Sequence, residues 1–585
     1  MSTASTVFPA RAKTALLIFS LIWLTACGGG GGGSSTNTEP VDESATVTDG
    51  DISSNDIVDS LTVEVNDSHF MSTHFSGSGN CASCHNELTD ANGEDVSIES
   101  DWSTSMMANS TRDPFWRAKV ASEIKRNPQF KEVLDNKCST CHAPMANVEA
   151  RFEGSIVELF DEGFLNPQNP YYNHSMDGVS CSACHQIEDN GKLGTLEGFS
   201  GNFSIVDLGT SAERTAFGQY TDPAINPMLN NSGFRPKQGE HMSSSAMCAT
   251  CHNLKTPFVD GAGNIVSLTP ESEFPEQMVY TEWENSSFAT GSTVTSCQDC
   301  HMPKTDNVKI SSRPGTLAAR DDFSRHTMVG ANSTMLDMLS RNKSLLGVTA
   351  SGFDTAINRT RAMLESAAEL EVVSQSLVNN ELTVQLRINN RSGHKLPTSF
   401  PSRRVYLHFV VRDNAGNILF ESGKTNPDGS IQGVDADTDL SRYEPHYEQI
   451  TREDQVQVYE SIMADTDNNV TYTLLRAATY VKDNRIPPTG FDKNNVENDI
   501  RVAGTAMDDD NFNSGSDIVT YKVSLPSSEG ISFSAELNYQ SLAYGHIKDL
   551  FQDNDNPEVA RFEILFNNSN TIRSETIDII NGVIP

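Results

Sequence analysis

The C-terminal part of the chain shows the most regular alternation of apolar and polar residues. Apolar side chains occupy every second position in "LTVQLRINN" (382–390), in "RRVYLHFVV" (403–411) and from Ile531 to Tyr539. A period of two is typical of strands with one buried face. The turn sequence "DNAGN" (413–417) predicts a hairpin between the second segment and "ILFES". We therefore expect an antiparallel β-sandwich over residues 372–585.

A helical period precedes this region. The segment "FDTAINRTRAMLESAAEL" places Ile357, Thr360, Leu364 and Ala367 at spacings of three and four, and Asp354 stands where an N-cap is expected. This pattern predicts a helical connector over residues 336–371.

The beginning of the chain has the pattern of an export signal. Arg11 and Lys13 precede the apolar run "TALLIFSLIWLTA", which is too short to span a bilayer comfortably. The run ends in "LTAC", which resembles a bacterial lipoprotein cleavage box and implies a signal peptide over 1–26 and a lipid on Cys27. The alternative is a cleaved soluble signal with a chance cysteine. Gly28 stands where Asp often signals inner-membrane retention, so the resemblance implies an outer-membrane anchor, periplasmic-facing or at the cell surface.

Composition limits the remaining possibilities. Residues 27–62 are rich in Gly, Ser, Thr and acidic residues, which predicts a flexible linker. The net charge of −36 argues against nucleic acid as a partner, because phosphate binding needs a basic surface. The acidity is explained by solubility or by docking to a cationic partner. Residues 63–335 are rich in Asn, Ser, Thr and Gly, so they have little apolar material for a core of their own.

Ten of the 11 cysteines fall into CxxCH motifs. The five motifs are Cys81/Cys84/His85, Cys138/Cys141/His142, Cys181/Cys184/His185, Cys248/Cys251/His252 and Cys297/Cys300/His301. A single CxxC pair is compatible with zinc, a redox dithiol or haem. Zinc sites do not require His at the next position, and a disulfide framework would not pair every cysteine at one spacing. Five pairs out of five followed by His favour c-type haem attachment.

The chemistry of haem c explains the spacing. The two thiols form thioethers with the haem vinyl groups, and the next residue supplies an imidazole to the iron. The sequence thus predicts five covalently bound haem c groups, ten cysteines as anchors and five proximal histidines. Five porphyrins would also supply the core that residues 63–335 lack.

Phrases around the motifs resemble multihaem c-type cytochromes of the bacterial envelope. They are "DGVSCSACH" at the third motif, "CHMP" at the fifth and "HTMVGAN" around His326, and the resemblance covers about residues 65–335. It implies a pentahaem cytochrome of lipoprotein type. The expected fold of residues 63–335 is short helices and long loops around closely packed haems.

The number of further histidines in or beside this region matches the number of irons. These candidate distal ligands are His69, His74, His174, His241 and His326. The positions of His74, His241 and His326 resemble distal-ligand positions in multihaem cytochromes. For each histidine the alternative is a place at the surface or a contact with a haem propionate.

Two more residues are candidate distal ligands. "DWSTSMM" and "EWENSSF" share a W-x-x-S frame in which relatives often carry His five residues after Trp, but this chain has Met107 and Phe288 there. A Met107 ligand would raise the potential of its haem, whereas the alternative is packing on a porphyrin face. His394 lies in "NRSGHKLPTSF", which is similar to a phrase beside haem domains in related cytochromes; the alternative is a histidine that supports a tight loop.

The C-terminal region offers less chemistry. It has no cysteine and no nucleophile–base signature. Acidic loops such as "DADTD" (435–439) are candidates for Ca²⁺, but the EF-hand pattern is absent because Leu440 and His446 replace the required Gly and Glu. A solvated loop is the alternative, and the sandwich is expected to brace the haem region or to dock a partner.

These features lead to three functional hypotheses. The first is an electron relay between envelope redox carriers and a terminal acceptor or partner reductase, since bis-His ligation leaves no open iron position. The second is a multihaem oxidoreductase with one open-site haem that acts on a small nitrogen or sulfur compound; CxxCK, the mark of a Lys-ligated catalytic haem, is absent. The third is a β-sandwich binding protein with structural haems. Electron transfer is favoured over catalysis, and enzymatic activity stays an open question.

Overall fold

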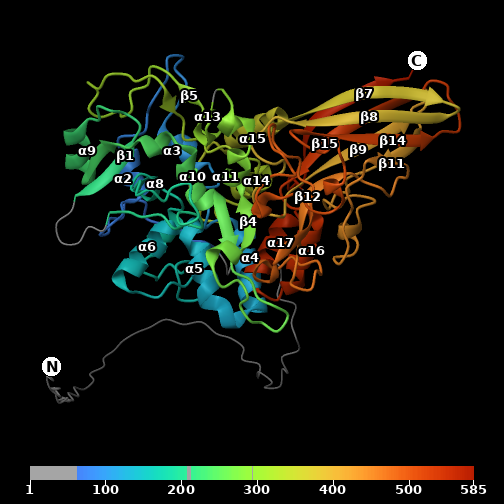
Figure 1. Cartoon of the computed structure of the whole chain (residues 1–585). Helices are drawn as coiled ribbons and strands as arrows, with labels where there is room; N and C mark the ends of the chain where they lie inside the picture. Colours follow the sequence, from blue (N-terminus) through green and yellow to red (C-terminus); the bar gives the residue numbers. More distant parts are fainter. Residues whose placement is uncertain (1–61, 207–212, 293, 569, 585) are drawn as a thin grey trace, which may run out of the picture. The chain divides into compact units, whose positions relative to one another are not determined.

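The computed structural model describes residues 62–206, 213–292, 294–568 and 570–584 (Figure 1). All of them fall within one unit that spans Ser53–Pro585. The expected signal peptide, the lipidated Cys27 and the linker up to residue 61 lie outside the described residues. Within the described ranges, no helix has the length and apolar character needed to cross a membrane.

The N-terminal half, up to residue 332, consists of short helices, three small two-stranded sheets and long loops.

 In these sheets, β1 (Arg214–Gly218) pairs with β2 (Phe234–Gln238), β3 (Asn253–Thr256) with β4 (Phe274–Met278), and β5 (Lys304–Thr305) with β6 (Phe323–Ser324). The helices are α2 (Ser78–Ala82), α3 (Ile98–Ser103), α4 (Pro114–Arg126), α5 (Lys131–His142), α6 (Pro144–Glu153), α7 (Tyr172–Met176), α8 (Cys181–Cys184), α9 (Ile225–Ser232), α10 (Ser245–His252), α11 (Val279–Glu284), α12 (Ser287–Thr290) and α13 (Cys297–His301).

Every CxxCH motif lies in or at the end of a short helix. The second, fourth and fifth motifs form the C-terminal ends of α5, α10 and α13, whereas α2 and α8 end within the first and third motifs. A helical turn places residues four apart on one face, so each motif presents its first cysteine and its histidine side by side.

Helix α4 is the longest helix in the described part of this half. The side chain of Asp113 accepts hydrogen bonds from the backbone N–H groups of Phe115 and Trp116, and Pro114 occupies the first turn. An N-cap acceptor and a proline at this position are both typical of a helix start. Nine of its 13 residues are buried, so most of α4 lies in the interior.

Two helices connect the halves. They are α14 (Ser333–Arg341) and α15 (Phe353–Ala367), and α15 buries Ile357, Thr360 and Leu364 as their helical spacing predicts. The helical region ends earlier than the predicted residue 371, because Ala368 already pairs with Asn390 in a β-ladder.

The C-terminal half, from residue 368 onward, contains two sheets around one core. The first has the order β13-β12-β9-β15-β16, with β10 paired to β9, and the second has the order β11-β14-β8-β7. The strands are β7 (Ala368–Val378), β8 (Glu381–Asn390), β9 (Arg404–Arg412), β10 (Ile418–Ser422), β11 (Gln449–Ile450), β12 (Val458–Ala464), β13 (Thr479–Asp483), β14 (Ser516–Ser524), β15 (Ser532–Gln540) and β16 (Glu575–Val583). The pairing is antiparallel except between β11 and β14.

The predicted alternation directs side chains into this core. Leu382, Val384, Leu386 and Ile388 of β8 are fully buried. Phe409 of β9 stacks on Tyr521 of β14 with ring centroids 3.9 Å apart, so the two sheets are in direct contact.

The sequence pattern did not indicate that helices follow β15. Helices α16 (Tyr544–Leu550) and α17 (Pro557–Phe566) return to the N-terminal half, and α17 lies beside α4 in Figure 1. Arg126 of α4 donates to Asp549 at 2.7 Å and to Asp553 at 2.6 Å. The two halves therefore share an interface that includes partly buried ion pairs.

Candidate functional site

The five CxxCH motifs surround a single cavity of about 1000 Å³. Its lining includes nine of the ten motif cysteines, all five motif histidines, His326 and His394. Motifs that are far apart in the sequence thus meet in one place. The apolar side chains of Trp102, Phe217 and Tyr280 also line this cavity.

The ten motif cysteines are free thiols, and several lie against cysteines of other motifs. The thiol pairs within hydrogen-bonding reach are Cys81 and Cys181, Cys141 and Cys251, and Cys248 and Cys297. The first motif therefore contacts the third, and the fourth contacts both the second and the fifth. None of these contacts involves the two cysteines of one motif, as a CxxC redox disulfide would require.

Local hydrogen bonds join the first and third motifs. Asp177 accepts from the backbone N–H of Ser78 at 2.9 Å and from its hydroxyl at 2.6 Å. Gly178 has φ +64°, and a Cβ there would lie 2.7 Å from the carbonyl oxygen of Met107. The "DG" that precedes the third motif is thus explained by a cap on α2 and by a close backbone approach.

Backbone carbonyl groups hold most of the motif imidazoles. In four motifs the Nδ1–H group donates to a backbone oxygen: that of His85 to Ile310 O (2.6 Å), that of His142 to Ser110 O (3.3 Å), that of His185 to Phe217 O (2.5 Å) and that of His301 to Val329 O (2.6 Å). His326 and His394 donate in the same way to Ser324 O and Lys395 O, each at 3.0 Å. A proton fixed on Nδ1 leaves the lone pair of Nε2 free for a metal.

Burial lowers the pKa of four of the motif imidazoles and of His326 and His394. It lowers the pKa of His142 and of His252 to about 4, and that of His326 to about 3. The pKa values of His85, His185 and His394 are also lowered by burial. Only a neutral imidazole ligates a metal, so the site favours the form that coordination needs.

Two pairs of imidazoles have the separation expected for ligands of one metal. The ring centroids of His185 and His326 are 6.3 Å apart, and those of His301 and His394 are 6.4 Å apart. A nitrogen binds a first-row transition metal at about 2 Å and lies roughly 1 Å from its ring centre, so two opposed ligands place their centroids about 6 Å apart. Among the motif histidines in the described ranges, only His185 and His301 face another imidazole at this distance.

His142 has a different neighbour. The indole of Trp116 lies 4.7 Å from its imidazole, centroid to centroid, and the two planes are inclined by 12°. Trp116 comes from α4, so the interface between the halves also borders the second motif. No sequence pattern indicates this contact, because a lone tryptophan at helical spacing is most often a core residue.

The other four candidate histidines are not among the residues that line the cavity. His69 is exposed beside Asp67, and His74 is buried with Nδ1 3.2 Å from a carboxylate oxygen of Glu149. His241 donates from Nε2 to Ile187 O at 2.9 Å. His174 is buried against Phe70, and neither of its ring nitrogens has a hydrogen-bond partner. His174 thus keeps two free nitrogens, whereas His241 has Nε2 already engaged.

Both W-x-x-S segments border the cavity. Met107 and Phe288 are among its lining residues, as are Trp102 and Trp283. The indole N–H of Trp102 donates to Val179 O and that of Trp283 to Thr295 O, each at 2.9 Å. Each tryptophan thereby ties its segment to the chain just before a CxxCH motif.

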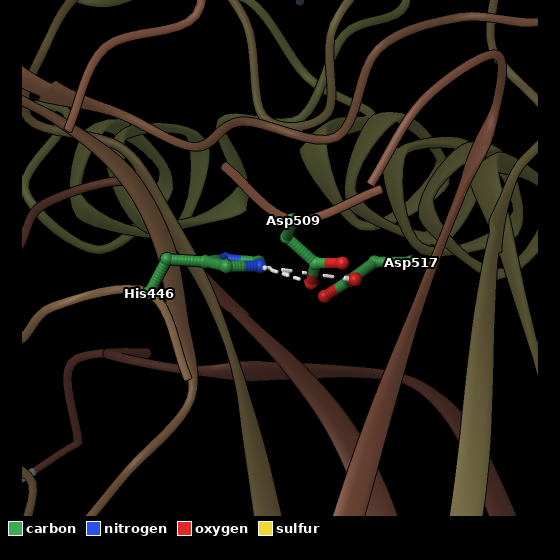
Figure 2. Close-up of side chains that lie close together, drawn as sticks. All are labelled: His446, Asp509 and Asp517. Carbon is green, nitrogen blue, oxygen red and sulfur yellow. Dashed lines mark hydrogen bonds and ion pairs between the residues drawn. The ribbon is translucent and has the colours of Figure 1, made fainter. Parts of the chain in front are cut away.

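The C-terminal half contains a buried cluster of possible metal ligands, formed by His446, Asp509 and Asp517 (Figure 2). Their ligand atoms lie within 4.8 Å of one another, and Nε2 of His446 is 3.1 Å from Asp509 Oδ2. The side chains of Gln457 and Asn484 donate to Nδ1 of His446 at 3.0 and 3.1 Å.

These two amides determine where the His446 proton lies. The amide oxygen of Gln457 accepts from Tyr447 N, and that of Asn484 accepts from Glu460 N, so neither amide can be turned round. Nδ1 must therefore accept, and the proton lies on Nε2, which donates to Asp509. A protonated Nε2 has no lone pair for a metal, so the cluster fits a hydrogen-bonded His–Asp unit better than a metal site.

The acidic loop considered for Ca²⁺ uses its carboxylates within the protein. Arg404 donates to both carboxylate oxygens of Asp437 at 2.8 Å, and Arg442 pairs with Asp435. Cations already neutralise these groups, which gives no support to a calcium site there.

Comparisons with known proteins add little to this geometry. No protein-family model matches the chain, and no curated protein is significantly similar to it. One solved structure, a penta-heme cytochrome c552 from Thermochromatium tepidum, is similar with a TM-score of 0.48 and 16% sequence identity, over 87% of this chain and 99% of that chain. This likeness is too weak to establish a common fold.

The residues around the cavity fit haem c as a group. Free thiols are available in pairs, an imidazole follows each pair, and the cavity that they share has apolar side chains in its walls. The two opposed imidazole pairs further match the axial ligands of a six-coordinate iron.

Proposed function

We propose that the chain is a pentahaem c-type cytochrome that relays electrons in the bacterial envelope. The observation that carries this proposal is the convergence of all five CxxCH motifs on one cavity. Cys81, Cys84, Cys138, Cys141, Cys181, Cys184, Cys248, Cys251, Cys297 and Cys300 would hold the haems, and His85, His142, His185, His252 and His301 would be the proximal ligands. Haem supplies one-electron redox chemistry at iron.

The residues of the chain have distinct roles in this function. The cysteines fix each porphyrin to a short helix, and the carbonyl groups that accept from Nδ1 orient each imidazole. Burial excludes water and, together with the distal ligand, sets the potential of each iron. Because thiols of different motifs lie within hydrogen-bonding reach, haems attached through them would be close neighbours. The haem of the first motif would lie beside that of the third, and the haem of the fourth motif would lie beside those of the second and the fifth.

Distal ligation supports a relay. His326 opposite His185 and His394 opposite His301 would occupy both axial positions of two irons. A six-coordinate iron passes electrons but offers no site for substrate.

A second function is favoured by the remaining motifs. The imidazoles of His85, His142 and His252 have no such facing imidazole in the described part of the chain. One open haem there would suit a multihaem oxidoreductase that acts on a small nitrogen or sulfur compound. His74, His174, His241 and Met107 remain the ligands that would close these positions.

The surroundings of the protein are part of the proposal. The "LTAC" sequence supports a lipid anchor on Cys27 in the outer membrane, and the expected partners are redox proteins, either cytochromes or a reductase. The acidic net charge would favour docking to a partner with a cationic surface.

Mass spectrometry and EPR of the purified holoprotein test the function. We expect the mass of five covalent haems and a majority of low-spin signals from the oxidised protein. Replacement of Cys181 and Cys184 by Ala should remove one haem only. A mature protein without covalent haem would refute the proposal. CO binding to one haem of the reduced wild-type protein would instead support the oxidoreductase.

A further inference from the structure

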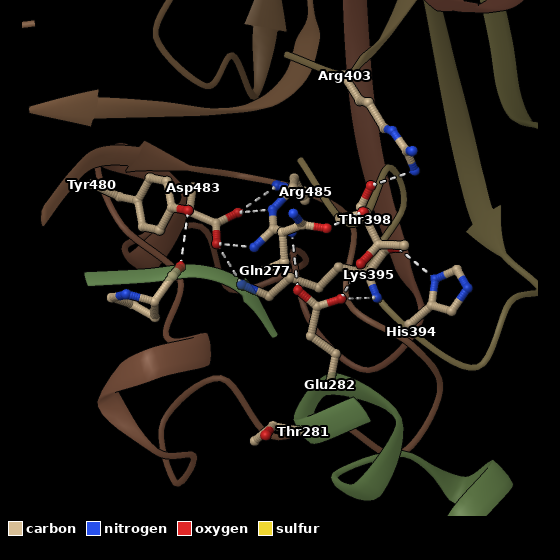
Figure 3. A network of polar contacts seen from close by, with 12 residues as sticks. Gln277, Thr281, Glu282, His394, Lys395, Thr398, Arg403, Tyr480, Asp483 and Arg485 are labelled. Atoms are coloured by element: carbon tan, nitrogen blue, oxygen red, sulfur yellow. Dashed lines mark hydrogen bonds and ion pairs between the residues drawn. The ribbon is translucent and has the colours of Figure 1, made fainter. Parts of the chain in front are cut away.

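A buried charge network holds the loop that carries His394 (Figure 3). Glu282 of α11 accepts through Oε2 from the backbone N–H of Lys395 at 3.2 Å and from Thr398 Oγ1 at 2.5 Å. One carboxylate oxygen thus fixes the loop at two points directly after the histidine. The side chain of Glu282 is fully buried, so water does not compete for these bonds.

The other members of the network balance its charge. Arg485 lies 2.9 Å from Glu282 Oε1 and donates to both oxygens of Asp483. Lys395 donates from Nζ to Asp483 at 2.6 Å. Burial by itself raises the pKa of Asp483, but Arg485 and Lys395 lower it to about 2. Arg485 and Lys395 therefore keep Asp483 ionised in the interior.

The opposite side of the loop packs against the second W-x-x-S segment. A Cβ at Gly393 would lie 3.2 Å from Cδ1 of Trp283 and 3.4 Å from Cγ of Phe288. The backbone before His394 therefore rests on two aromatic rings, and the backbone after it is held by Glu282. These constraints leave the imidazole of His394 6.4 Å from that of His301.

We propose that Glu282 is a positioning residue that sets the distal coordination of the haem at Cys297, Cys300 and His301. This inference rests on the proposed function, because it requires a haem at the fifth motif. Without Glu282, the N–H of Lys395 and the hydroxyl of Thr398 lose their acceptor, and two buried cations share one carboxylate. The loop then has no fixed position, and His394 leaves the iron.

The network also gives the C-terminal half a role in electron transfer. Asp483 is the last residue of β13 and Arg485 follows it, so the six-stranded sheet supplies half of the charges that hold the ligand loop. The sheet would thereby act on the potential of the fifth haem through its distal ligand.

The test compares Glu282→Ala with Glu284→Ala in the full-length holoprotein. Glu284 lies two residues away on α11 and is exposed, so its replacement removes the same charge without touching the loop. We expect Glu282→Ala to convert one low-spin haem per chain to high spin in EPR and to add one CO-binding haem after reduction. Glu284→Ala should match the wild type. Glu282→Gln keeps an acceptor oxygen for the loop and should fall between the two.

A further pair of variants separates this inference from its premise. His394→Ala should open the same haem, and added imidazole should restore its low-spin signal. If His394→Ala leaves every haem low-spin, the assignment of His394 as a ligand is wrong. If His394→Ala opens one haem but Glu282→Ala changes only the thermal stability, Glu282 has a structural role and the inference is overturned.

A less disruptive variant covers the case in which Glu282→Ala yields no folded holoprotein. Thr398→Val removes one of the two hydrogen bonds to the loop and leaves the four charges in place. It should shift the midpoint potential of one haem and leave the other potentials unchanged. Unchanged potentials at all five haems would count against the positioning role.

Discussion

Asp517 of β14 provides a sharp test of the buried His–Asp cluster. Its side chain is fully buried; Tyr459 OH donates to Oδ2 at 2.6 Å, but Oδ1 has no hydrogen-bond partner. Burial raises the pKa of this carboxyl group above its ordinary value. We predict that Asp517→Asn stabilises the protein at neutral pH.

The magnitude follows from the charge on an unpartnered group. A buried polar group without a partner costs about 1–3 kcal/mol and a charged one costs more, and Asn keeps a polar group here but removes the charge. Because the pKa is raised in the folded state, the wild type has its full stability below the ordinary Asp pKa of about 4 and loses stability as the pH rises through the folded-state pKa. The advantage of Asp517→Asn should therefore vanish near pH 4 and reach about 1–3 kcal/mol at higher pH.

Denaturant unfolding of the holoprotein between pH 4 and 8 measures this difference. Asp510→Asn is the matched control, because Asp510 is exposed on the same segment as Asp509 and its replacement changes the net charge equally. A stability gain that does not depend on pH, or a loss of stability at pH 7, would refute the reasoning. If Zn²⁺ stabilised the wild type but not Asp517→Asn, the proton assigned to Nε2 of His446 would be wrong.

Three further predictions concern other parts of the molecule. Phe409→Ala should cost about 3–5 kcal/mol of unfolding free energy in urea, because a fully buried ring that joins the two sheets is lost, and haem content should not change. Arg126→Ala should speed limited proteolysis of the C-terminal helices, since it removes the ion pairs that join α4 to Asp549 in α16 and to Asp553 just after it; an unchanged cleavage rate would contradict their role at this interface. His326→Ala should create one high-spin haem in EPR, whereas replacement of the exposed His69 should not.

The sequence determined the local features that repeat with a short period. The alternation at 382–388 predicted β8 and its buried face, and "DNAGN" predicted the antiparallel pairing of β9 with β10. The spacing of the five CxxCH motifs indicated haem c without a structure, because both thioether bonds and the axial ligand come from one helical turn. The prediction that residues 368–371 are helical was wrong, since ladder pairing with β8 outweighs the helical spacing there.

The tertiary structure decided which distant residues meet. No local pattern pairs His185 with His326 or His301 with His394, because each pair joins separate segments. The same holds for Glu282, an ordinary glutamate in the sequence that becomes the acceptor for the loop of His394, more than a hundred residues away. Haem attachment depends on neighbours within one turn and can be read from the chain, whereas distal coordination and charge compensation depend on long-range packing, which only the folded molecule fixes.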